Sequence, residues 1–407
     1  MTDSSPLDTS LKRTLGPFMV TFYGLGTIIG AGIYVLLGNV AGFAGNWLQY
    51  SFLLAGAIAA FTALSYAELS SRLPQCAGAA IYVQEAWWNK GLSALVGWML
   101  VLTGIVSAAA ITNGFVGYLN VFVTMERALA ISILVLLLGL IAAWDMKTSA
   151  VMISIVTLIE VCGLLLVVGY ASTAEPVAAA VNTAASIPGT VPGVILGGFI
   201  AFYAFIGFED MVNIVEEVKV PGRNMPLGII LAVILAIGLY FIVALAALNV
   251  MSAADLAQSE APLADMMLAS GGSTTLITLI GLVAVINGAL VQIIMASRVL
   301  YGMAGHSMAP TILGTINTVT RTPIVATVFV VTFVLIFALA LPLTQLAQIT
   351  SMIMLVIFTL VNSALVVIKR RSYQDYTGIN LPIAIPVIGS ITALLLVLFQ
   401  VFSFLSS

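Results

Sequence analysis

The stretch that decides the fold lies near the amino terminus, from Tyr23 to Tyr34, and reads YGLGTIIGAGIY. It belongs to a segment without charged residues that runs from Thr14 to Ala67. Four glycines fall within nine residues of it, and each destabilises a helix by up to about 1 kcal/mol relative to alanine. The pattern predicts an apolar helix that is interrupted in its middle.

The composition explains why such a helix would lie in a membrane. Of 407 residues, 61% are hydrophobic and 7% are charged, whereas soluble domains carry about 25% charged residues. A water-exposed surface cannot be built from so few charges, but lipid-facing helices need none. We therefore expect an all-α polytopic membrane protein embedded in the lipid bilayer.

Other classes of protein are disfavoured by the same counts. The net charge is −3, which indicates no nucleic-acid partner. The single histidine, His306, and the cysteines Cys76 and Cys162 form no metal-ligand spacing, so we expect neither a metal nor a cofactor. An embedded enzyme would need clustered ligands or a nucleophile with a base. A channel would need a filter or rings of charge.

Charge-free runs predict about eleven spans, because roughly 20 apolar residues cross a hydrocarbon core. The expected spans are two within 14–67, broken at 39–46, then 91–125, 128–144, 148–172, one within 192–214, 227–250, 274–301, two within 322–368, broken near Pro342, and 382–404. A single membrane domain would thus comprise a tail (1–13), two groups of five spans (14–172 and 192–368) and one additional span (382–404).

A second unusual stretch opens the second group of five. Residues 197–209 read GGFIAFYAFIGFE, with aromatic side chains around Gly207 and an acid, Glu209, at the end. Interrupted spans at corresponding places in two halves point to an inverted-repeat transporter whose site lies between them. The alternative is close helix packing through small residues, for which Gly26 and Gly30 have the spacing. The corresponding positions in the two halves favour the transporter.

The basic residues give the orientation. If the amino terminus is cytoplasmic, twelve of the thirteen lysines and arginines fall on the inner side, and Arg127 falls outside. This is the distribution that the positive-inside rule describes. We expect a multi-pass protein of the cell membrane with its carboxyl terminus outside.

An interrupted helix offers polar backbone groups at mid-membrane. Free N–H groups suit a carboxylate, and free C=O groups suit an ammonium. A pair of breaks can therefore hold the part common to all amino acids without a charged side chain, which would be costly at that depth. The two breaks predict an amino acid substrate.

Five motifs add a family resemblance. They are IGAGIY at 29–34, SYAELSSRLP at 65–74, AFIGFE at 204–209, EEVKVPGRNMP at 216–226 and SRVLYGMA at 297–304. In this order and spacing the chain resembles amino acid permeases of the amino acid–polyamine–organocation superfamily, in its cationic-amino-acid-transporter-like branch. The resemblance implies secondary active transport and a LeuT-like five-plus-five inverted repeat with discontinuous helices 1 and 6. Such permeases usually have twelve spans, and the twelfth lies outside the repeat.

The resemblance also implies how the breaks would bind substrate. The carboxylate would meet the amides of residues 31–33, and the ammonium would meet the carbonyls of Ile28, Tyr203 and Ile206. Tyr203, or its neighbour Phe202, would be an aromatic gate. The full expected set is Ile28, Gly30, Ala31, Gly32, Ile33, Phe202, Tyr203, Ala204, Ile206, Gly207 and Asn287.

Polar residues inside the spans are given separate roles. Asn287 is the best candidate among them for lining the pocket, while Asn113, Gln292 and Asn362 are expected to form interhelical hydrogen bonds. A cationic substrate would want a carboxylate in the side-chain pocket, for which the resemblance implies the third span, and residues 106–112 contain no acid. We therefore predict a small or medium neutral amino acid, with cationic substrates as the alternative.

The acids near the site are assigned to two places. Glu68, Arg72 and Glu209 are expected in polar networks at the inner side. Glu160 lies roughly 18 Å along the fifth span, near the midplane of a core about 30 Å thick. A charge there costs about 3 kcal/mol or more, which favours a neutral carboxyl with an exchangeable proton.

Glu160 is therefore the predicted coupling group of a proton symporter. One alternative is a permanently neutral glutamate that donates one hydrogen bond to a carbonyl freed by the first break. Sodium coupling, uncoupled exchange and a non-transporting subunit of a membrane assembly are the alternatives for the whole protein.

Overall fold

The computed structural model of the protein describes residues 13–30, 32–74, 78–144, 150–175, 187–318, 320, 322–371 and 378–406. The α-helices are α1 (Pro17–Ile29), α2 (Gly32–Ala44), α3 (Leu48–Arg72), α4 (Gly78–Trp87), α5 (Lys90–Asn120), α6 (Arg127–Ala143), α7 (Ala150–Thr173), α8 (Val191–Ala201), α9 (Pro221–Val250), α10 (Ala253–Gln258), α11 (Pro262–Ala269), α12 (Thr274–Gly305), α13 (Ile324–Ala340), α14 (Leu343–Arg371) and α15 (Ala384–Ser406). The 3₁₀ segments are η1 (Gly45–Trp47), η3 (Phe202–Phe205), η4 (Phe208–Glu217) and η5 (Thr311–Gly314).

These helices confirm the prediction of an all-α polytopic membrane protein. Within the described ranges, eight helical stretches are long and apolar enough to cross a membrane, and three shorter apolar helices, α1, α6 and α13, accompany them. The outward faces of α6 and α15 carry exposed leucines, among them Leu137, Leu140, Leu395 and Leu398. Exposed leucines at this density suit contact with lipid rather than water.

The turns between neighbouring helices fall where glycine and proline require them. α2 and α3 are separated at Gly45, which has a φ of +56°, and a Cβ there would come within 2.3 Å of the Ile187 carbonyl oxygen. α13 and α14 are separated around Pro342. α3 continues five residues beyond the charge-free run, to Arg72, because Glu68 and Arg72 form an ion pair within the helix.

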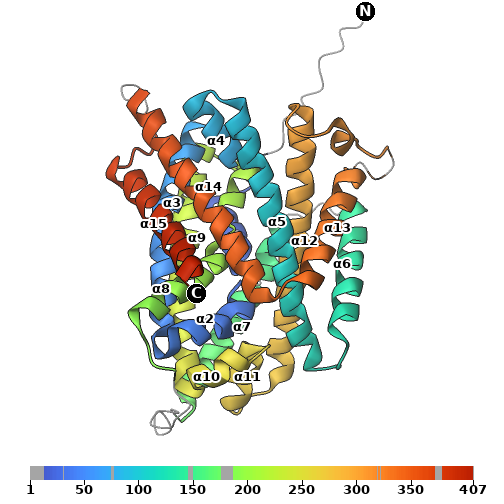
Figure 1. Ribbon diagram of the computed structural model, residues 1–407, viewed down its shortest axis with the longest axis vertical. Coiled ribbons are helices and arrows are strands. Elements are labelled where there is room, and N and C mark those ends of the chain that lie inside the picture. The colour runs from blue at the N-terminus through green and yellow to red at the C-terminus, as the bar shows by residue number, and fades with distance from the viewer. Residues whose placement is uncertain are drawn as a thin grey trace, which may run out of the picture.

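The two ends of the bundle carry different short helices (Figure 1). α4 lies at one end, and α10 and α11 lie at the opposite end. The predicted spans 227–250 and 274–301 leave residues 251–273 as a connection, and the structure forms α10 and α11 there. Ser252 starts α10, because its side chain accepts a hydrogen bond from the amide of Asp255 at 3.1 Å.

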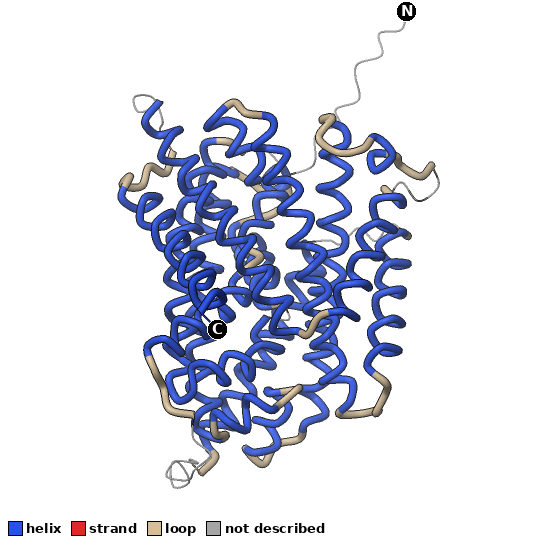
Figure 2. The backbone as a smooth tube through the Cα atoms, in the orientation of Figure 1, coloured by secondary structure: helices blue, strands red, loops and turns tan. Residues whose placement is uncertain are grey.

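The long helices run roughly lengthwise, with most loops gathered at the two ends (Figure 2). Around the interrupted helices, α1 packs against α9 and α7, and α2 packs against α8. α3 packs along α9, and α5 packs along α12. This arrangement places both helix interruptions inside the bundle.

Candidate functional site

The first interruption lies between α1 and α2. α1 ends at Ile29, and Gly30 adopts φ +26° and ψ −129°, a conformation that residues with a Cβ rarely take. Its amide still donates to the Gly26 carbonyl at 3.1 Å. Helix resumes at Gly32, and the expected ligand Ala31 lies outside the described residues.

The second interruption follows η3. Ile206 is extended and Gly207 has a φ of +129°. From Phe208 the chain continues as the 3₁₀ segment η4. The Gly207 amide, freed by the break, donates to the Glu209 carboxylate at 2.8 Å, so the structure places Glu209 at this break.

The two interruptions contact each other through glycines. A Cβ on Gly32 would lie 2.6 Å from the Cα atom of Ala204, and a Cβ on Gly207 would lie 2.1 Å from the carbonyl oxygen of Thr27. Neither position can hold a side chain without moving backbone. The glycines therefore serve close approach of two backbones in addition to interrupting their helices.

Tyr240 of α9 joins the two interruptions by hydrogen bonds. Its hydroxyl lies 3.0 Å from the Ile28 carbonyl oxygen and 2.9 Å from the Ala204 carbonyl oxygen. Nothing in the sequence pattern indicated this role, since Tyr240 is one of twelve tyrosines and stands in an otherwise ordinary apolar span.

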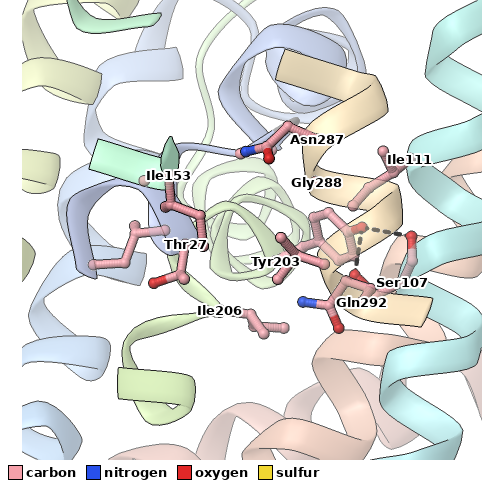
Figure 3. A pocket seen from close by; sticks show the side chains of 14 residues that line it. Thr27, Ser107, Ile111, Ile153, Tyr203, Ile206, Asn287, Gly288 and Gln292 are labelled. Atoms are coloured by element: carbon pink, nitrogen blue, oxygen red, sulfur yellow. Dashed lines mark hydrogen bonds between the residues drawn. The ribbon is translucent and has the colours of Figure 1, made fainter. Parts of the chain in front are cut away.

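A small cavity of about 30 Å³ lies beside the two interruptions, which is room for about two water molecules. Figure 3 shows its side chains, with the Tyr203 ring reaching towards Ser107. The lining residues are Gly26, Thr27, Ile28, Gly30, Gly32, Ser107, Ile111, Ile153, Tyr203, Ile206, Asn287, Gly288, Val291 and Gln292.

The cavity brings together six members of the expected set: Ile28, Gly30, Gly32, Tyr203, Ile206 and Asn287. Ile33, Phe202, Ala204 and Gly207 are buried behind it. Between the two aromatic residues considered for a gate, Tyr203 lines the cavity, while Phe202 packs against Phe358 with ring centroids 5.8 Å apart.

Tyr203 is held against α5 by hydrogen bonds. Its hydroxyl lies 2.8 Å from Ser107 Oγ and donates to the Ser107 carbonyl oxygen at 3.0 Å. Because the tyrosine has one proton, the Ser107 hydroxyl is the donor in the first bond. Tyr203 thus spans the cavity from the second interruption to α5.

A larger cavity of about 690 Å³ adjoins the first and shares Ser107, Ile206 and Gln292 with it. It extends to the end of the bundle that carries α4, where Glu85 and Lys90 are exposed. Its ionisable lining residues are Glu85, Lys90, Glu209, Asp210, Arg298 and His306, with Tyr66 at its wall.

At the opposite end of the bundle, helices pack closely through glycines. A Cβ on Gly38 would lie 2.3 Å from the Leu256 carbonyl oxygen, and one on Gly117 would lie 2.1 Å from the Glu260 carbonyl oxygen. α10 and the residues that follow it therefore press directly onto α2 and α5. The two cavities meet at their shared residues Ser107, Ile206 and Gln292.

Glu160 of α7 is fully buried beside the first interruption. Within the described residues, both of its carboxyl oxygens lack a hydrogen-bond partner. Its main-chain carbonyl accepts a hydrogen bond from the Tyr34 hydroxyl at 2.7 Å. One turn earlier, Thr157 lies against Gly26, so α7 contacts both halves of the interrupted helix.

Glu68 and Arg72 form one network with Lys369, which no sequence motif had singled out. Glu68 Oε1 lies 2.7 Å from Arg72 Nη2 and 2.6 Å from Lys369 Nζ of α14. Glu68 Oε2 accepts from the Leu381 amide at 3.0 Å. Glu209 is not among these contacts, because its carboxylate turns back to Gly207.

The remaining polar residues divide between packing and cavity. Asn362 of α14 donates to Thr62 at 2.9 Å and accepts from Ser65 at 2.6 Å, which joins α14 to α3. Asn113 of α5 donates to the Ala338 carbonyl at 3.2 Å. Gln292 lines both cavities. In the part of the chain that the structure describes, no group of histidine, cysteine or acidic side chains could hold a metal ion.

Comparisons with known proteins agree with these features. The model of the amino acid permease family matches residues 15–407. The branched-chain amino acid permease BcaP of Bacillus subtilis is 28% identical, over 95% of this chain and 87% of that protein. The methylthioribose transporter of the same organism is 27% identical, over 94% and 87%. The vacuolar cationic amino acid transporter 4 of Arabidopsis thaliana is 27% identical, over 88% of this chain and 64% of that protein.

These relatives are transporters rather than enzymes, as the sequence predicted. The chain spans less than two thirds of the plant transporter but most of the two bacterial ones. The family match covers nearly every residue, including both interruptions and the cavity between them. The chain therefore belongs to the amino acid permease family of the amino acid–polyamine–organocation superfamily.

Proposed function

We propose that the protein is a secondary active transporter that carries neutral amino acids across the cell membrane together with protons. The observation that carries the proposal is the meeting of two interrupted helices beside a cavity. In this proposal α1 with α2 is the first of eleven spans, and α8 with η3 and η4 is the sixth. The first ten spans form the five-plus-five inverted repeat.

The substrate would lie between the two interruptions. Its carboxylate would accept hydrogen bonds from the amides of residues 31–33, at the start of α2, where the helix dipole favours a negative charge. Its ammonium would donate to the carbonyls of Ile28, Tyr203 and Ile206, all of which border the cavity. The cavity is small, so we expect Tyr203 to move from Ser107 when a substrate binds.

The side-chain end of the cavity favours a neutral substrate. Ser107, Ile111, Val291 and Gln292 line it, and none of them carries a charge. One similar protein is named for branched-chain amino acids and another for cationic ones. Among its described lining residues the small cavity has no carboxylate, which supports the neutral class, whereas Glu209 and Asp210 line the adjoining larger cavity.

Glu160 would carry the coupled proton. A charged carboxylate without a hydrogen-bond partner is costly at this depth, so the group would hold a proton in at least one state of the cycle. Its position beside both halves of the first interrupted helix would link its charge to the shape of the site. Sodium coupling and uncoupled exchange remain the competing mechanisms.

The two cavities support an orientation. The larger one reaches the end of the bundle that carries Lys90 and Arg298, which the positive-inside rule assigns to the cytoplasm. The structure would then represent the inward-facing state, with α10 and α11 closing the outer side. The amino terminus would be cytoplasmic and the carboxyl terminus external.

Thermal unfolding of the purified protein in detergent tests the proposal. A ligand at about 100 times its Kd stabilises the folded state by about 2.7 kcal/mol. We expect alanine, serine, valine, leucine or isoleucine to raise the melting temperature more than arginine or lysine does. Methylthioribose, which has neither an ammonium nor a carboxylate, serves as the control ligand. A panel in which no amino acid stabilises the protein would contradict the proposal.

A further inference from the structure

Tyr240 lies outside both interrupted helices, yet its hydroxyl contacts both. The oxygen is 3.0 Å from the Ile28 carbonyl oxygen and 2.9 Å from the Ala204 carbonyl oxygen. The side chain is fully buried. Its ring packs against Phe205 and Phe52, with centroids 5.0 and 5.9 Å away. The position of the hydroxyl is therefore fixed by the packing of its ring.

The Tyr240 hydroxyl leaves hydrogen-bonding capacity on the Ile28 and Ala204 carbonyl oxygens. A tyrosine hydroxyl has one proton, and a carbonyl oxygen has two lone pairs. The Ile28 and Ala204 oxygens must share that proton, so both keep the capacity to accept further hydrogen bonds. A buried carbonyl at the end of a helix needs a donor. For Ile28, which lines the cavity, an ammonium group with its three N–H bonds is suited to supply one.

The two carbonyls belong to different interrupted helices. Ile28 is near the end of α1, and Ala204 lies within η3. Contact between Gly32 and Ala204 limits how closely the segments approach, but such contact does not orient a carbonyl. A hydrogen bond is directional, and one shared hydroxyl constrains both oxygens at once.

We propose that Tyr240 is a positioning residue of the substrate site: its hydroxyl orients the Ile28 carbonyl and, through Ala204, holds the segment whose Tyr203 and Ile206 carbonyls would bind the α-ammonium of the substrate. The inference rests on the proposed function, because it presumes an amino acid between the interruptions. It adds a determinant on α9 that would distinguish an amino group from another polar group at the same carbon.

Tyr118 provides a matched control. It is also fully buried, and its hydroxyl also donates to a main-chain carbonyl, that of Tyr34, at 2.7 Å. That carbonyl lies one turn beyond the first interruption, and Tyr34 does not line the cavity. Tyr118→Phe removes the same chemical group as Tyr240→Phe without touching the ammonium site.

The experiment compares amino acids with their 2-hydroxy acids. Affinities of L-alanine, L-lactate, L-leucine and L-2-hydroxyisocaproate are measured in detergent for the wild type, Tyr240→Phe and Tyr118→Phe. We expect the wild type to prefer the amino acids. In Tyr240→Phe the preference should fall about tenfold, the effect of losing roughly one well-oriented hydrogen bond. In Tyr118→Phe it should stay within about twofold.

An unchanged preference in Tyr240→Phe, or an equal loss of affinity for both kinds of ligand, would overturn the inference. If that variant does not fold or binds neither ligand, the same preference is measured for protein that carries 3,5-difluorotyrosine at position 240. It keeps the ring and hydroxyl but changes the donor strength, so an unchanged preference again overturns the inference. Failure of the wild type to bind either amino acid would instead count against the proposed function.

Discussion

Gly207 lies directly against Thr27, so that a Cβ on Gly207 would come within 2.1 Å of the Thr27 carbonyl oxygen. Its φ of +129° adds a conformational requirement to this steric one. The same residue thus interrupts one helix and lets the other approach. The first prediction follows from this double role.

Gly207→Ala is expected to separate the two interruptions and abolish amino acid binding. The strained backbone alone costs on the order of 1–3 kcal/mol, and the displaced Thr27 backbone adds to this. Ligand-dependent melting temperatures measure the effect. Gly238→Ala is the control, because a Cβ on Gly238 in α9 would have no neighbour within 4 Å. Binding that persists in Gly207→Ala would show that the glycine contact is dispensable.

Gly32→Leu is expected to abolish binding by a purely steric route, since its Cβ would lie 2.6 Å from the Cα atom of Ala204. Gly30→Leu acts differently, because its Cβ would have no neighbour closer than 3.8 Å, and only its φ of +26° opposes a side chain. Both variants should still insert into the membrane. Unchanged affinity for every substrate in both would refute the placement of the site.

Ser107→Asp is expected to admit cationic substrates. The new carboxylate would stand where Ser107 now bonds to Tyr203, at the cavity wall, and would attract a lysine or arginine side chain. Competition against labelled neutral substrate should show arginine and lysine gaining at least about tenfold relative to leucine, a difference of about 1.4 kcal/mol. Ser107→Ala, which adds no charge, should keep the neutral preference. If arginine and lysine already outcompete neutral amino acids in the wild type, the substrate class is wrong.

Glu160→Gln is expected to uncouple transport from protons. Glutamine matches the shape of a protonated glutamate but releases no proton. In proteoliposomes, uptake driven by an imposed pH gradient should disappear, while exchange between equal internal and external pools survives. Glu126→Gln, at the exposed start of α6, should leave both unchanged. A Glu160→Gln protein that still concentrates substrate by pH alone would exclude Glu160 as the coupling group.

Glu68→Gln is expected to destabilise the protein strongly, because it leaves Lys369 and Arg72 without their buried carboxylate. Breaking a buried ion pair costs about 3–5 kcal/mol. Lys369→Met should lower the free energy of unfolding by less, since Arg72 still neutralises Glu68. Arg370 is an exposed neighbour, so Arg370→Met should change the free energy of unfolding by no more than about 0.5 kcal/mol. Denaturation in detergent measures all three variants. An equal loss of unfolding free energy in Glu68→Gln and Arg370→Met would contradict a stabilising role of the network.

The sequence could predict those features that depend on local chemistry. The low charge content predicted the membrane class, and glycines at Gly30 and Gly207 predicted where two helices stop, because backbone conformation is a local property. The separation of α2 from α3 and of α13 from α14 followed for the same reason. The expected ligand residue Ile28 lines the cavity, and it stands beside such a break.

Features that depend on how helices face each other could not be predicted. Tyr240 is buried at the junction of two breaks only because α9 turns that face inward. Lys369 stands in a run of three basic residues that suits a water-exposed helix end, and the packing of the chain around Leu381 buries it alone. Glu209 was expected in the inner-side network, but the amide released at Gly207 is a nearer partner.

The main-chain pairing of Leu15 with Val218 has a mechanical consequence. The amides of Thr14 and Leu15 donate to the Glu217 carbonyl at 2.9 and 3.0 Å, and the Lys219 amide donates to the Leu15 carbonyl at 2.9 Å. These bonds join the residues just before α1 to the end of η4, so they tie the two interrupted helices together at that end. Because only backbone atoms form these bonds, replacing the side chains of Thr14, Leu15, Glu217 or Lys219 would remove none of them.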